Sequence, residues 1–368
     1  MKIVEMVPDL TFGGAERFVT DLCNALIKEG NQVTLITLFD TKGMDTFEPL
    51  LSDNVKFLCL NKKIGFSPII PFKILFTIFK EKPSVVHTHL NCFIYTILAW
   101  LFLPWVKFVH TIHNDAYAEA GSTIELKMKK IAFGRFVTPV TISHESQKSF
   151  WELYKKDSFL IYNGRPIDNP DCQREKAIES EIASIKSSHN TKIIVNIARF
   201  AAQKNQLSLA KAVNIINKDK PQIDLLFVGS YQHAQDSIEI FNAISKIITP
   251  HIHILGAKSN ASSFFKYADA FCLSSIYEGM PITIIESFAN GCPVLSTPVG
   301  GVVNMINDGI NGFLTKDTEV ESIVATLEKF CSLTEKERLS MKKNAKDSYE
   351  QFSMNRCVQA YLSCFSKI

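Results

Sequence analysis

Short apolar runs rich in β-branched residues alternate along the chain with segments that have the periodicity of amphipathic helices. The runs predict strands at residues 2–7, 32–38, 55–60, 84–88, 106–111 and 138–142, and at 192–198, 223–228, 251–255, 269–274 and 293–297. The clearest helix is predicted from about 14 to 29, where Phe18, Leu22 and Leu26 recur at four-residue spacing before Gly30. Strands that alternate with helices predict an α/β fold with parallel, doubly wound sheets.

The alternation is interrupted once, at residues 163–191, which contain two prolines, many charges and no strong apolar run. This composition is typical of a linker followed by a surface helix. We therefore expect two α/β domains, residues 1–168 and 169–345, that face each other across a cleft. Ligands of such sheets bind beyond the carboxyl ends of the strands. The sequence is helical after about Lys316, and residues 341–366 are long enough to cross back, so we expect 346–368 to pack on the first domain.

Charge and cysteine content narrow the class of protein. The 368 residues carry 40 Lys and Arg against 37 Asp and Glu, and this near-balance argues against a nucleic-acid-binding protein. The nine cysteines are scattered, without a C-x-x-C pair or zinc-site spacing, which favours free thiols in a reducing, cytoplasmic setting. Glu5 interrupts the first apolar run, so no secretory signal is expected.

Two segments bear on a membrane. Residues 92–106 form the longest apolar stretch, about 15 residues, which is short of the ~20 needed to span a bilayer and predicts a buried helix that leads into a strand. Residues 62–80 mix Phe, Lys and Pro. They could pack as an ordinary helix on the sheet, or contact a membrane with Phe in the interface and Lys62, Lys63, Lys73 and Lys80 on anionic headgroups. The sequence leaves both interpretations open. If the protein contacts the cytoplasmic face of an inner membrane peripherally, we expect the contact to be made by this segment.

The densest candidate chemistry lies in residues 274–291. Glu278 and Glu286 stand eight residues apart, and Pro281 fits the first position of a helix that ends at Asn290-Gly291. This loop follows a buried-type strand and leads into a helix N-terminus, whose free N–H groups suit a phosphate. The two carboxylates are good acceptors for sugar hydroxyls. An ordinary βα turn with solvated carboxylates would explain the spacing equally well.

Two cations follow the first strand of the second half. Arg199 and Lys204 lie five residues apart around a turn, where they could neutralise a diphosphate. No D-x-D sequence occurs, so the usual acidic clamp for a metal–diphosphate is missing, and the two cations would have to replace it. We therefore expect no metal and no cofactor apart from the substrate itself.

The first half offers glycines and histidines after its strands. Gly13-Gly14 would let backbone approach a ligand closely, although it fits neither G-x-G-x-x-G nor G-x-x-x-x-G-K-[ST], and a tight turn alone explains it. His113 is best placed on a loop beyond a strand, where it could bond a substrate hydroxyl or act as an acid or base. His87 and His89 alternate on a strand, and we do not expect a metal there.

In combination these motifs resemble glycosyltransferase family 4, a retaining family with the GT-B architecture. The resemblance covers nearly the whole chain through GGAERF (13–18), the His113 loop, NG (163–164), ARFAAQKNQ (198–206), FVG (227–229), YEGMPITIIESFANGCPV (277–294), GG (300–301) and DGINGFL (308–314). Its specific part is R-x4-K together with E-x7-E. The resemblance implies two facing Rossmann-like domains with a C-terminal helix that crosses back.

The resemblance also implies roles for particular residues. Arg199 and Lys204 would hold the donor diphosphate, and Glu286 would accept the ribose hydroxyls. Glu278 would meet the donor sugar. The remaining donor-binding residues would be Gly14, which closes over the phosphates, and Gly229, Gly279, Met280, Pro281 and Ile282.

On the acceptor side the resemblance implies Gly13, His89 and His113, with His113 near the 6-hydroxyl of the sugar at the reaction centre. Two departures from the family pattern stand out. The crossover usually written N-G-[VI]-D is two residues longer here, Asn163-Gly-Arg-Pro-Ile-Asp168, and G-G-x-P-E appears as Gly300-Gly-Val-Val-Asn304. The crossover geometry and the donor preference are therefore expected to differ.

The expected function is metal-independent, retaining transfer of a hexose-type sugar from a nucleotide-diphosphate sugar, with a UDP-sugar favoured. The expected acceptor is a lipid-linked polysaccharide or glycolipid of the cell envelope, such as lipopolysaccharide or capsule. Two alternatives stay open. A nucleotide-sugar epimerase would release product without any acceptor, and a sugar-nucleotide-binding protein would bind the donor without turnover.

Overall fold

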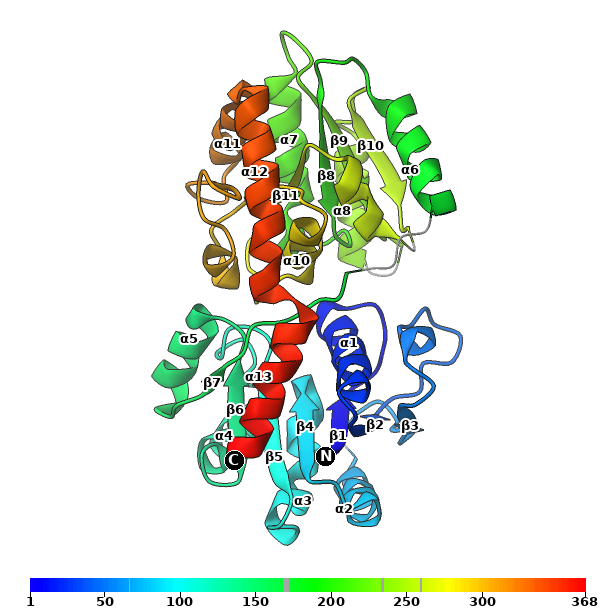
Figure 1. Cartoon of the computed structure of the whole chain (residues 1–368), viewed down its shortest axis with the longest axis vertical. Helices are drawn as coiled ribbons and strands as arrows, with labels where there is room; N and C mark the ends of the chain where they lie inside the picture. The colour runs from blue at the N-terminus through cyan, green and yellow to red at the C-terminus, as the bar shows by residue number, and fades with distance from the viewer. Residues whose placement is uncertain (66, 168–171, 233–234, 259) are drawn as a thin grey trace. The chain divides into compact units, whose positions relative to one another are not determined.

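The computed structural model describes residues 1–65, 67–167, 172–232, 235–258 and 260–368 (Figure 1). The chain forms two compact units, each described by itself: unit 1 is Met1–Pro166 with Phe352–Ile368, and unit 2 is Ile167–Gln351. The expected boundary at 168/169 lies outside the described residues. The segment that rejoins unit 1 begins at Phe352 rather than at 346, because a helix of unit 2 continues to Ser348.

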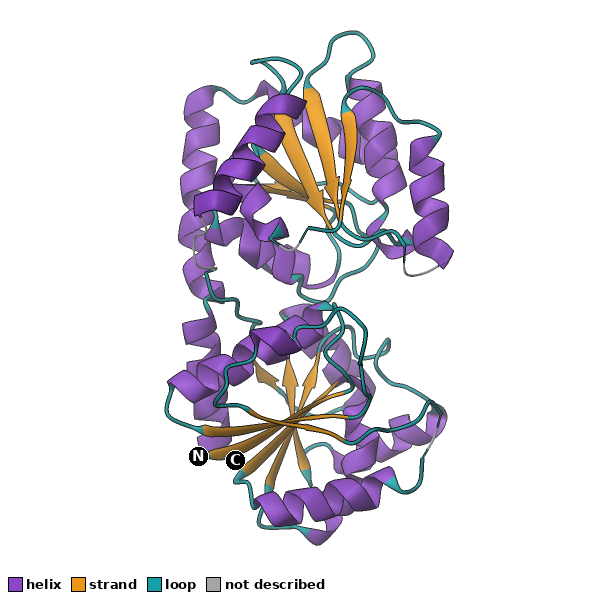
Figure 2. Cartoon of the chain, turned by 90° about the vertical axis from the view of Figure 1, so that its right-hand side faces the viewer, coloured by secondary structure: helices purple, strands orange, loops and turns teal. Residues whose placement is uncertain are grey.

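Unit 1 is built on a seven-stranded parallel sheet of strand order β3-β2-β1-β4-β5-β6-β7. The strands are β1 (Lys2–Val7), β2 (Gln32–Thr37), β3 (Lys56–Cys59), β4 (Val85–His89), β5 (Lys107–Ile112), β6 (Val137–Thr141) and β7 (Phe159–Leu160). The helices are α1 (Gly14–Lys28), α2 (Ile70–Glu81), α3 (Ile97–Phe102), α4 (Thr123–Ala132), α5 (His144–Tyr154) and α13 (Met354–Lys367), with 3-10 turns η1 (Glu48–Leu50) and η2 (Leu90–Thr96). Figure 2 shows helices on both faces of the strands.

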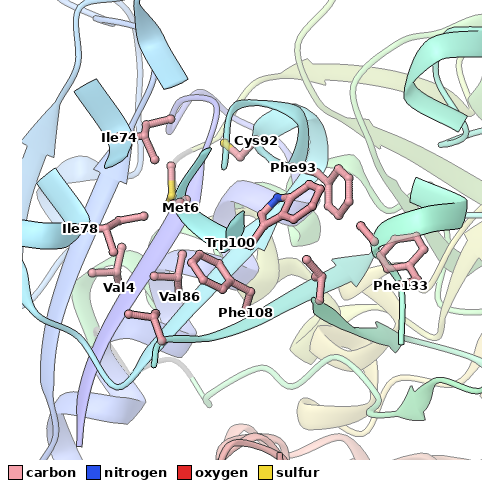
Figure 3. Close-up of a cluster of buried hydrophobic side chains, with 14 of the residues drawn as sticks. Val4, Met6, Ile74, Ile78, Val86, Cys92, Phe93, Trp100, Phe108 and Phe133 are labelled. Carbon is pink, nitrogen blue, oxygen red and sulfur yellow. The ribbon is translucent and has the colours of Figure 1, made fainter. Parts of the chain in front are cut away.

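The two faces of this sheet differ in chemistry. One face is apolar: Val4, Met6, Val86 and Phe108 pack against Ile74 and Ile78 of α2 and against Phe93 and Trp100 of η2 and α3 (Figure 3). The other face carries Glu5 of β1, His87 and His89 of β4 and Thr111 of β5, all fully or almost fully buried. This division follows from the two-residue alternation of side chains along a strand. Aromatic rings of α1 and α13 cover the polar face, including Phe18, Tyr361 and Phe365.

Unit 2 is built on a six-stranded parallel sheet of strand order β10-β9-β8-β11-β12-β13. The strands are β8 (Lys192–Ile197), β9 (Ile223–Val228), β10 (Ile252–Gly256), β11 (Ala270–Leu273), β12 (Val294–Ser296) and β13 (Gly312–Leu314). The helices are α6 (Cys172–Ile185), α7 (Gln206–Ile216), α8 (Gln235–Ser245), α9 (Phe264–Tyr267), α10 (Ile282–Ala289), α11 (Val320–Ser332) and α12 (Glu335–Ser348). Short 3-10 turns are η3 (Ala202–Lys204), η4 (Ala261–Ser263), η5 (Gly300–Asn304) and η6 (Tyr349–Phe352). Phe200, Phe227 and Leu327 lie in its core.

The predicted fold class is confirmed, and the differences are local. Strands β7 and β13, two and three residues long, were not predicted. Residues 341–366 are not one helix: α12 ends at Ser348, and α13 begins anew after Ser353, whose hydroxyl accepts the N–H of Arg356. The 92–106 stretch forms η2 and α3 before β5, and no helix in the described ranges is long and apolar enough to cross a membrane.

In each sheet the strand order reverses once, between β1 and β4 in unit 1 and between β8 and β11 in unit 2. At such a switch point the connections leave toward opposite sides and open a crevice beyond the carboxyl ends of the two strands. The loops that follow these four strands begin near Pro8, Leu90, Ala198 and Ser274. All the densest sequence motifs fall in or close to these loops.

Candidate functional site

An ion pair spans the switch point of unit 2. Lys204 ends the short turn after β8, and Glu278 lies in the loop after β11. The Nζ of Lys204 lies 2.6 Å from Oε1 of Glu278, and the hydroxyl of Ser275 donates to the same oxygen at 2.6 Å. The two charged side chains are 17% and 8% exposed. Two residues singled out from distant motifs thus meet directly, and the lysine balances a nearly buried carboxylate.

Hydrogen bonds lock the two loops of unit 2 together. The hydroxyl of Ser274 donates to the carbonyl of Lys204 at 2.9 Å. The Gln203 side chain donates to the carbonyl of Tyr277 at 2.9 Å, and the N–H of Ile276 donates to the carbonyl of Gln203 at 2.8 Å. The ion pair therefore sits on a fixed frame rather than on independent loops.

Two glycines permit close backbone contacts behind this frame. A Cβ on Gly229 would overlap the carbonyl of Ala198, the residue before Arg199. Gly300 has φ +49°, and a Cβ there would overlap the carbonyl of Glu278, while the N–H of Gly301 donates to the carbonyl of Gly279 at 2.8 Å. Gly229 and the Gly300-Gly301 pair thus support the positions of Arg199 and Glu278.

Arg199 contrasts with Lys204. Its side chain is exposed, and we find no hydrogen bond or ion pair of its guanidinium with any other described residue. Its backbone is held, because Gln206 donates to the Arg199 carbonyl at 2.9 Å. Unit 2 thus presents one exposed cation beside the switch point and a second cation that is already paired.

Helix α10 differs slightly from expectation. Pro281 has ψ 120°, which is extended, so it precedes the helix instead of occupying its first position, and the helix start has no side-chain cap. Glu286 lies on the second turn and is half-buried. The side chains of Met280 and Ile282 are 5% and 8% exposed, so contact with a ligand at this segment would be made through the backbone.

Unit 1 places Gly13 and Gly14 at the start of α1, directly after the β1 loop. Gly13 precedes the helix in extended conformation, without a side-chain cap. Gly14 faces open space, because a Cβ built there would meet no atom within 4 Å. Gly14 is therefore not needed for packing within the chain, in contrast to Gly229 and Gly300.

His113 follows β5, and its ring is held by two side chains. Its Nε2 lies 2.8 Å from Nδ1 of His89, and the ring packs edge-on against Phe18. Burial lowers the pKa of His113 to about 3, so the ring is neutral at physiological pH. Burial raises the pKa of Glu119, in the loop that follows, to about 7, although the charge of Lys129 acts against that rise.

His89 does not occupy the position that the sequence suggested on the acceptor side. Its side chain is 0% exposed, and its second ring nitrogen, Nε2, lies 2.9 Å from Oε2 of Glu5. Burial lowers its pKa, and that of His87, to about 3. His89 therefore cannot touch an acceptor directly, because strand packing turns it inward onto Glu5.

Glu5, His87 and His89 are one set of potential metal ligands in the described part of the chain, with ligand atoms within 4.8 Å of one another. These atoms already hydrogen-bond to each other, so an ion would have to replace those bonds. The absence of a metal stays a prediction. Sequence reasoning missed Glu5 as a site residue; an acid in the middle of an apolar strand was the available signal.

Lys62 and Arg165 are both buried in unit 1. Lys62 is buried, not on a membrane-facing surface: its ammonium donates to the carbonyls of Lys63 and Gly65 and lies over the ring of Phe39. In the longer crossover, Arg165 is a buried anchor whose guanidinium donates to Asp21 at 3.1 Å and whose backbone pairs with the returning segment at Phe352 and Met354. Asp168 lies outside the described residues.

Two open parallel sheets, each with candidate residues at its switch point, define the GT-B class of glycosyltransferase. Comparison with known families agrees. Residues 12–169 match the model described as Glycosyltransferase Family 4, and residues 177–348 match Glycosyl transferases group 1. The chain belongs to glycosyltransferase family 4.

Similar proteins include two bacterial transferases. One, from Campylobacter jejuni, is named as an α-1,4-N-acetyl-D-galactosaminyltransferase acting on a diphospho-undecaprenol-linked saccharide; it is 24% identical, over 100% of this chain and 99% of that protein. Another, from Escherichia coli, is named UDP-Gal:α-D-GlcNAc-diphosphoundecaprenol α-1,3-galactosyltransferase, 25% identical over 83% of this chain and 78% of that protein. An Anabaena protein solved with UDP-glucose has the same fold, with TM-score 0.81, 19% identity and 100% of both chains covered.

Proposed function

We propose that this glycosyltransferase is retaining and metal-independent, and that it moves a hexose-type sugar from a UDP-sugar to a lipid-linked saccharide of the cell envelope. The observation that carries the proposal is the Lys204–Glu278 ion pair at the unit 2 switch point, beside the exposed Arg199. Cations and a carboxylate fixed in this way suit a diphosphate attached to a hydroxyl-rich sugar.

In the proposed mechanism the ion pair exchanges partners when the donor binds. Arg199 meets the diphosphate first, and Lys204 turns from Glu278 to a phosphate oxygen. Glu278, still bonded to Ser275, then accepts a sugar hydroxyl, and Glu286 accepts the ribose hydroxyls. As the glycosidic bond breaks, negative charge grows on the diphosphate, and the two cations stabilise it.

Unit 1 supplies hydrogen bonds rather than charge in this mechanism. His113 is neutral, so it can orient a hydroxyl but does not arrive as a protonated acid at neutral pH. Retention is assigned to attack from the face that the leaving group occupies, and the two-carboxylate scheme of glycosidases is not applied to Glu278 and Glu286.

Relatives support the donor and acceptor classes. The E. coli relative is named for UDP-Gal, and the Anabaena structure contains UDP-glucose. Both bacterial transferases are named for undecaprenol-diphosphate-linked acceptors. These names favour a UDP-sugar and a lipid-linked acceptor over the epimerase alternative, which needs no acceptor.

An exposed apolar surface on unit 1 supports contact with a membrane. Phe72, Phe76 and Phe79 lie on one stripe of α2 and are 64%, 68% and 55% exposed, opposite Ile74 and Ile78 in the core (Figure 3). Leu101, Phe102 and Trp105, at and after the end of α3, are 48%, 63% and 65% exposed. Helices α2 and α3 pack together, so we assign both groups to one membrane-facing surface.

Charges around this surface fit anionic headgroups. Lys63, Lys73 and Lys80 are exposed, whereas Glu81, the acid of α2, is buried against Lys56 at 2.6 Å. The outward stripe of α2 is thus cationic and apolar, which suits an anionic bilayer interface. The α3 part was missed in the sequence because the apolar run 92–106 was interpreted as wholly buried.

A donor panel tests the proposed activity. We expect UDP and UDP-sugars to raise the melting temperature more than GDP or ADP compounds do, since stabilisation grows with ligand concentration over Kd. Transfer to an undecaprenyl-diphosphate saccharide should proceed in EDTA. Loss of activity in EDTA that divalent ions restore would reject the metal-free mechanism, and sugar conversion without acceptor would favour the epimerase.

Liposome sedimentation tests the membrane surface. Phe72→Glu with Phe76→Glu should reduce binding to anionic vesicles without unfolding the protein. The matched control is Ile215→Glu with Leu339→Glu, which also adds two charges at exposed apolar positions, in unit 2. If the Phe72 and Phe76 variant sediments with vesicles as wild type does, α2 is not the membrane contact.

A further inference from the structure

The buried polar face of the unit 1 sheet forms one continuous hydrogen-bonded network that ends at His113. We call it the His113 network; its members are Glu5, His87, His89, Thr111, His113 and Tyr361. The network joins β1, β4 and β5 to helix α13. Only His113 among them is more than slightly exposed.

Glu5 lies at the centre of this network. Its Oε2 is 2.9 Å from Nδ1 of His87 and 2.9 Å from Nε2 of His89. From His87 the network runs through Nε2 to Thr111 Oγ1 at 2.8 Å and on to the Tyr361 hydroxyl at 2.9 Å. From His89 it runs through Nδ1 to Nε2 of His113 at 2.8 Å.

An ionised carboxylate can only accept hydrogen bonds, and this fixes every proton in the network. With Glu5 ionised, His87 must carry its proton on Nδ1, and His89 must carry its proton on Nε2. Neutral His89 then has a bare Nδ1, which accepts, so His113 must carry its proton on Nε2. On the other arm, Tyr361 donates to Thr111, and Thr111 donates to the bare Nε2 of His87.

We infer that the Glu5 carboxylate, acting through His89, holds His113 in the Nε2–H tautomer, so that Nδ1 of His113 is a hydrogen-bond acceptor for a ligand hydroxyl. Glu5 and His89 are thus positioning residues, because neither touches the ligand. Within the described ranges, Nδ1 of His113 has no hydrogen-bond partner. It is the one network atom left available for a substrate.

Burial of the network supports this directional role. The three histidines stay neutral because burial lowers their pKa values to about 3, so each has one donor and one acceptor nitrogen. Burial raises the pKa of Glu5, and the hydrogen bond and charge interaction with His89 act against that rise. Aromatic rings of Phe18 and Phe365 pack against the histidines and exclude water that could supply other partners.

Nuclear magnetic resonance of the whole, ligand-free protein with 15N-labelled histidine tests the inference directly. At pH 7 we expect His89 and His113 to show a protonated Nε2 and a bare Nδ1, and His87 to show the reverse. Signals are assigned by loss in single His→Gln variants. A His113 ring protonated on Nδ1, or protonated on both nitrogens, would overturn the inference.

The same sample also tests the rival use of these side chains. Glu5, His87 and His89 could hold a divalent ion, which would remove the proton that each histidine directs at Glu5. We expect metal analysis of the purified protein to find no stoichiometric zinc, and added zinc to leave the histidine signals in place. Stoichiometric metal bound at His87 and His89 would reject the tautomer network.

Enzyme kinetics provide a second test, which rests on the proposed function. Glu5→Met removes the acceptor at similar volume, and we expect about a tenfold loss of kcat/KM for sugar transfer, the effect of one hydrogen bond. Glu5→Gln keeps an oxygen that can accept, so it should recover part of that loss. UDP binding should change in neither variant, because no member of the His113 network is assigned to the nucleotide.

Thr88→Val is the matched control. Thr88 lies on β4 between His87 and His89 but faces the opposite side of the sheet, where its hydroxyl lies 2.9 Å from Nδ1 of His110. Its loss should reduce stability without changing the His113 tautomer. A Glu5→Met protein that folds and transfers sugar as wild type would overturn the positioning role. Correct tautomers in a protein without transferase activity would instead reject only the proposed function.

Discussion

The two units present their candidate residues in opposite physical forms. In unit 1, His87, His89 and Glu5 are completely buried, and their value lies in the direction of hydrogen bonds. In unit 2, Arg199 is exposed and Lys204 pairs with Glu278 at the edge of solvent, so their value lies in charge. Both sets stand at the switch point of a parallel sheet. The same topology thus carries one candidate site built on the direction of hydrogen bonds and another built on charge.

This difference predicts different responses to pH. Histidines that are buried and neutral resist protonation, so acid acts on them by unfolding unit 1. Unit 2 has a buried carboxylate, Asp224, for which burial raises the pKa but hydrogen bonds from Thr191, His251 and Ser187 hold it below its usual value. The stability that the Asp224 carboxylate contributes is therefore lost only below about pH 3.8, the ordinary pKa of an aspartate. Burial also lowers the pKa of one histidine of unit 2, His253, so we expect mild acid to destabilise unit 2 less than unit 1 rather than not at all.

Acid destabilisation of unit 1 is the largest effect that we expect. His87 and His89 have pKa values of about 3 when folded against 6.5 when exposed, so stability is full above pH 6.5 and falls progressively down to about pH 3. At pH 5 each histidine should cost about 2 kcal/mol, about 4 kcal/mol for the pair. Urea unfolding at pH 7.5 and pH 5 measures the difference.

The chain is well suited to this measurement, because its three tryptophans, Trp100, Trp105 and Trp151, all lie in unit 1. Their fluorescence follows unit 1 alone, and hydrogen exchange of β8 and β9 follows unit 2. We expect the tryptophan transition to move further than the opening free energies of β8 and β9, which are obtained from exchange after correction for the pH dependence of the intrinsic exchange rate. An equal loss of stability in both units at pH 5 would contradict the proposed difference in their responses to pH.

Sequence reasoning named more of the side chains that meet in unit 2 than of those that meet in unit 1. Arg199, Lys204 and Glu278 could be found because loop residues after strands are free to be polar, and their spacing forms a motif. Glu5, Thr111 and Tyr361 belong to a network that exists only after three strands and the C-terminal helix have assembled. No spacing along the chain relates residue 5 to 89, or 111 to 361.

The fold itself followed from periodicity, and the failures were of a different kind. The run 92–106 is apolar throughout, so hydropathy could not separate Trp100, which is 6% exposed, from Trp105, which is 65% exposed. Lys62 was considered as a contact for anionic headgroups because lysine usually lies at the surface, but two backbone carbonyls and an aromatic ring bind its ammonium inside unit 1.

Among the substitutions, removal of the Lys204 ammonium should reduce activity most. Lys204→Ala leaves the Glu278 carboxylate, 8% exposed, without its partner and takes one cation from the diphosphate, so we expect about a hundredfold loss of kcat, equal to about 2.7 kcal/mol. Lys211→Ala, an exposed lysine of α7, is the matched control and should leave the rate unchanged. Similar rates for the two variants would show that Lys204 serves only the fold.

Gly300 of unit 2 and Gly14 of unit 1 differ in the space around them. Gly300→Ala should destabilise unit 2 by roughly 1–3 kcal/mol, because φ is +49° and the new methyl group would overlap the Glu278 carbonyl. Gly14→Ala should leave the stability of unit 1 nearly unchanged, since the space around it is open, while weakening donor binding if Gly14 approaches the phosphates. Thermal melts and UDP titrations of both variants separate these outcomes.

The smallest effect concerns Glu119, the single acid of the His113 loop that opposes the histidine trend. Burial raises its pKa to about 7 from an ordinary 4.5, so the folded protein keeps this proton while the unfolded chain releases it, and stability is lost as pH rises from 4.5 to 7. This carboxyl changes the free energy of unfolding by at most about 1.4 kcal/mol per pH unit.

Glu119→Gln cannot titrate, so its stability should rise more steeply between pH 5.5 and 6.5 than that of wild type. Denaturation curves at the two pH values give the slopes, with Glu152→Gln as the control, since Glu152 is an exposed carboxylate on α5, outside the His113 loop. Parallel curves for wild type and Glu119→Gln would mean that the loop carboxylate is ionised throughout this range and does not contribute to the pH response of unit 1.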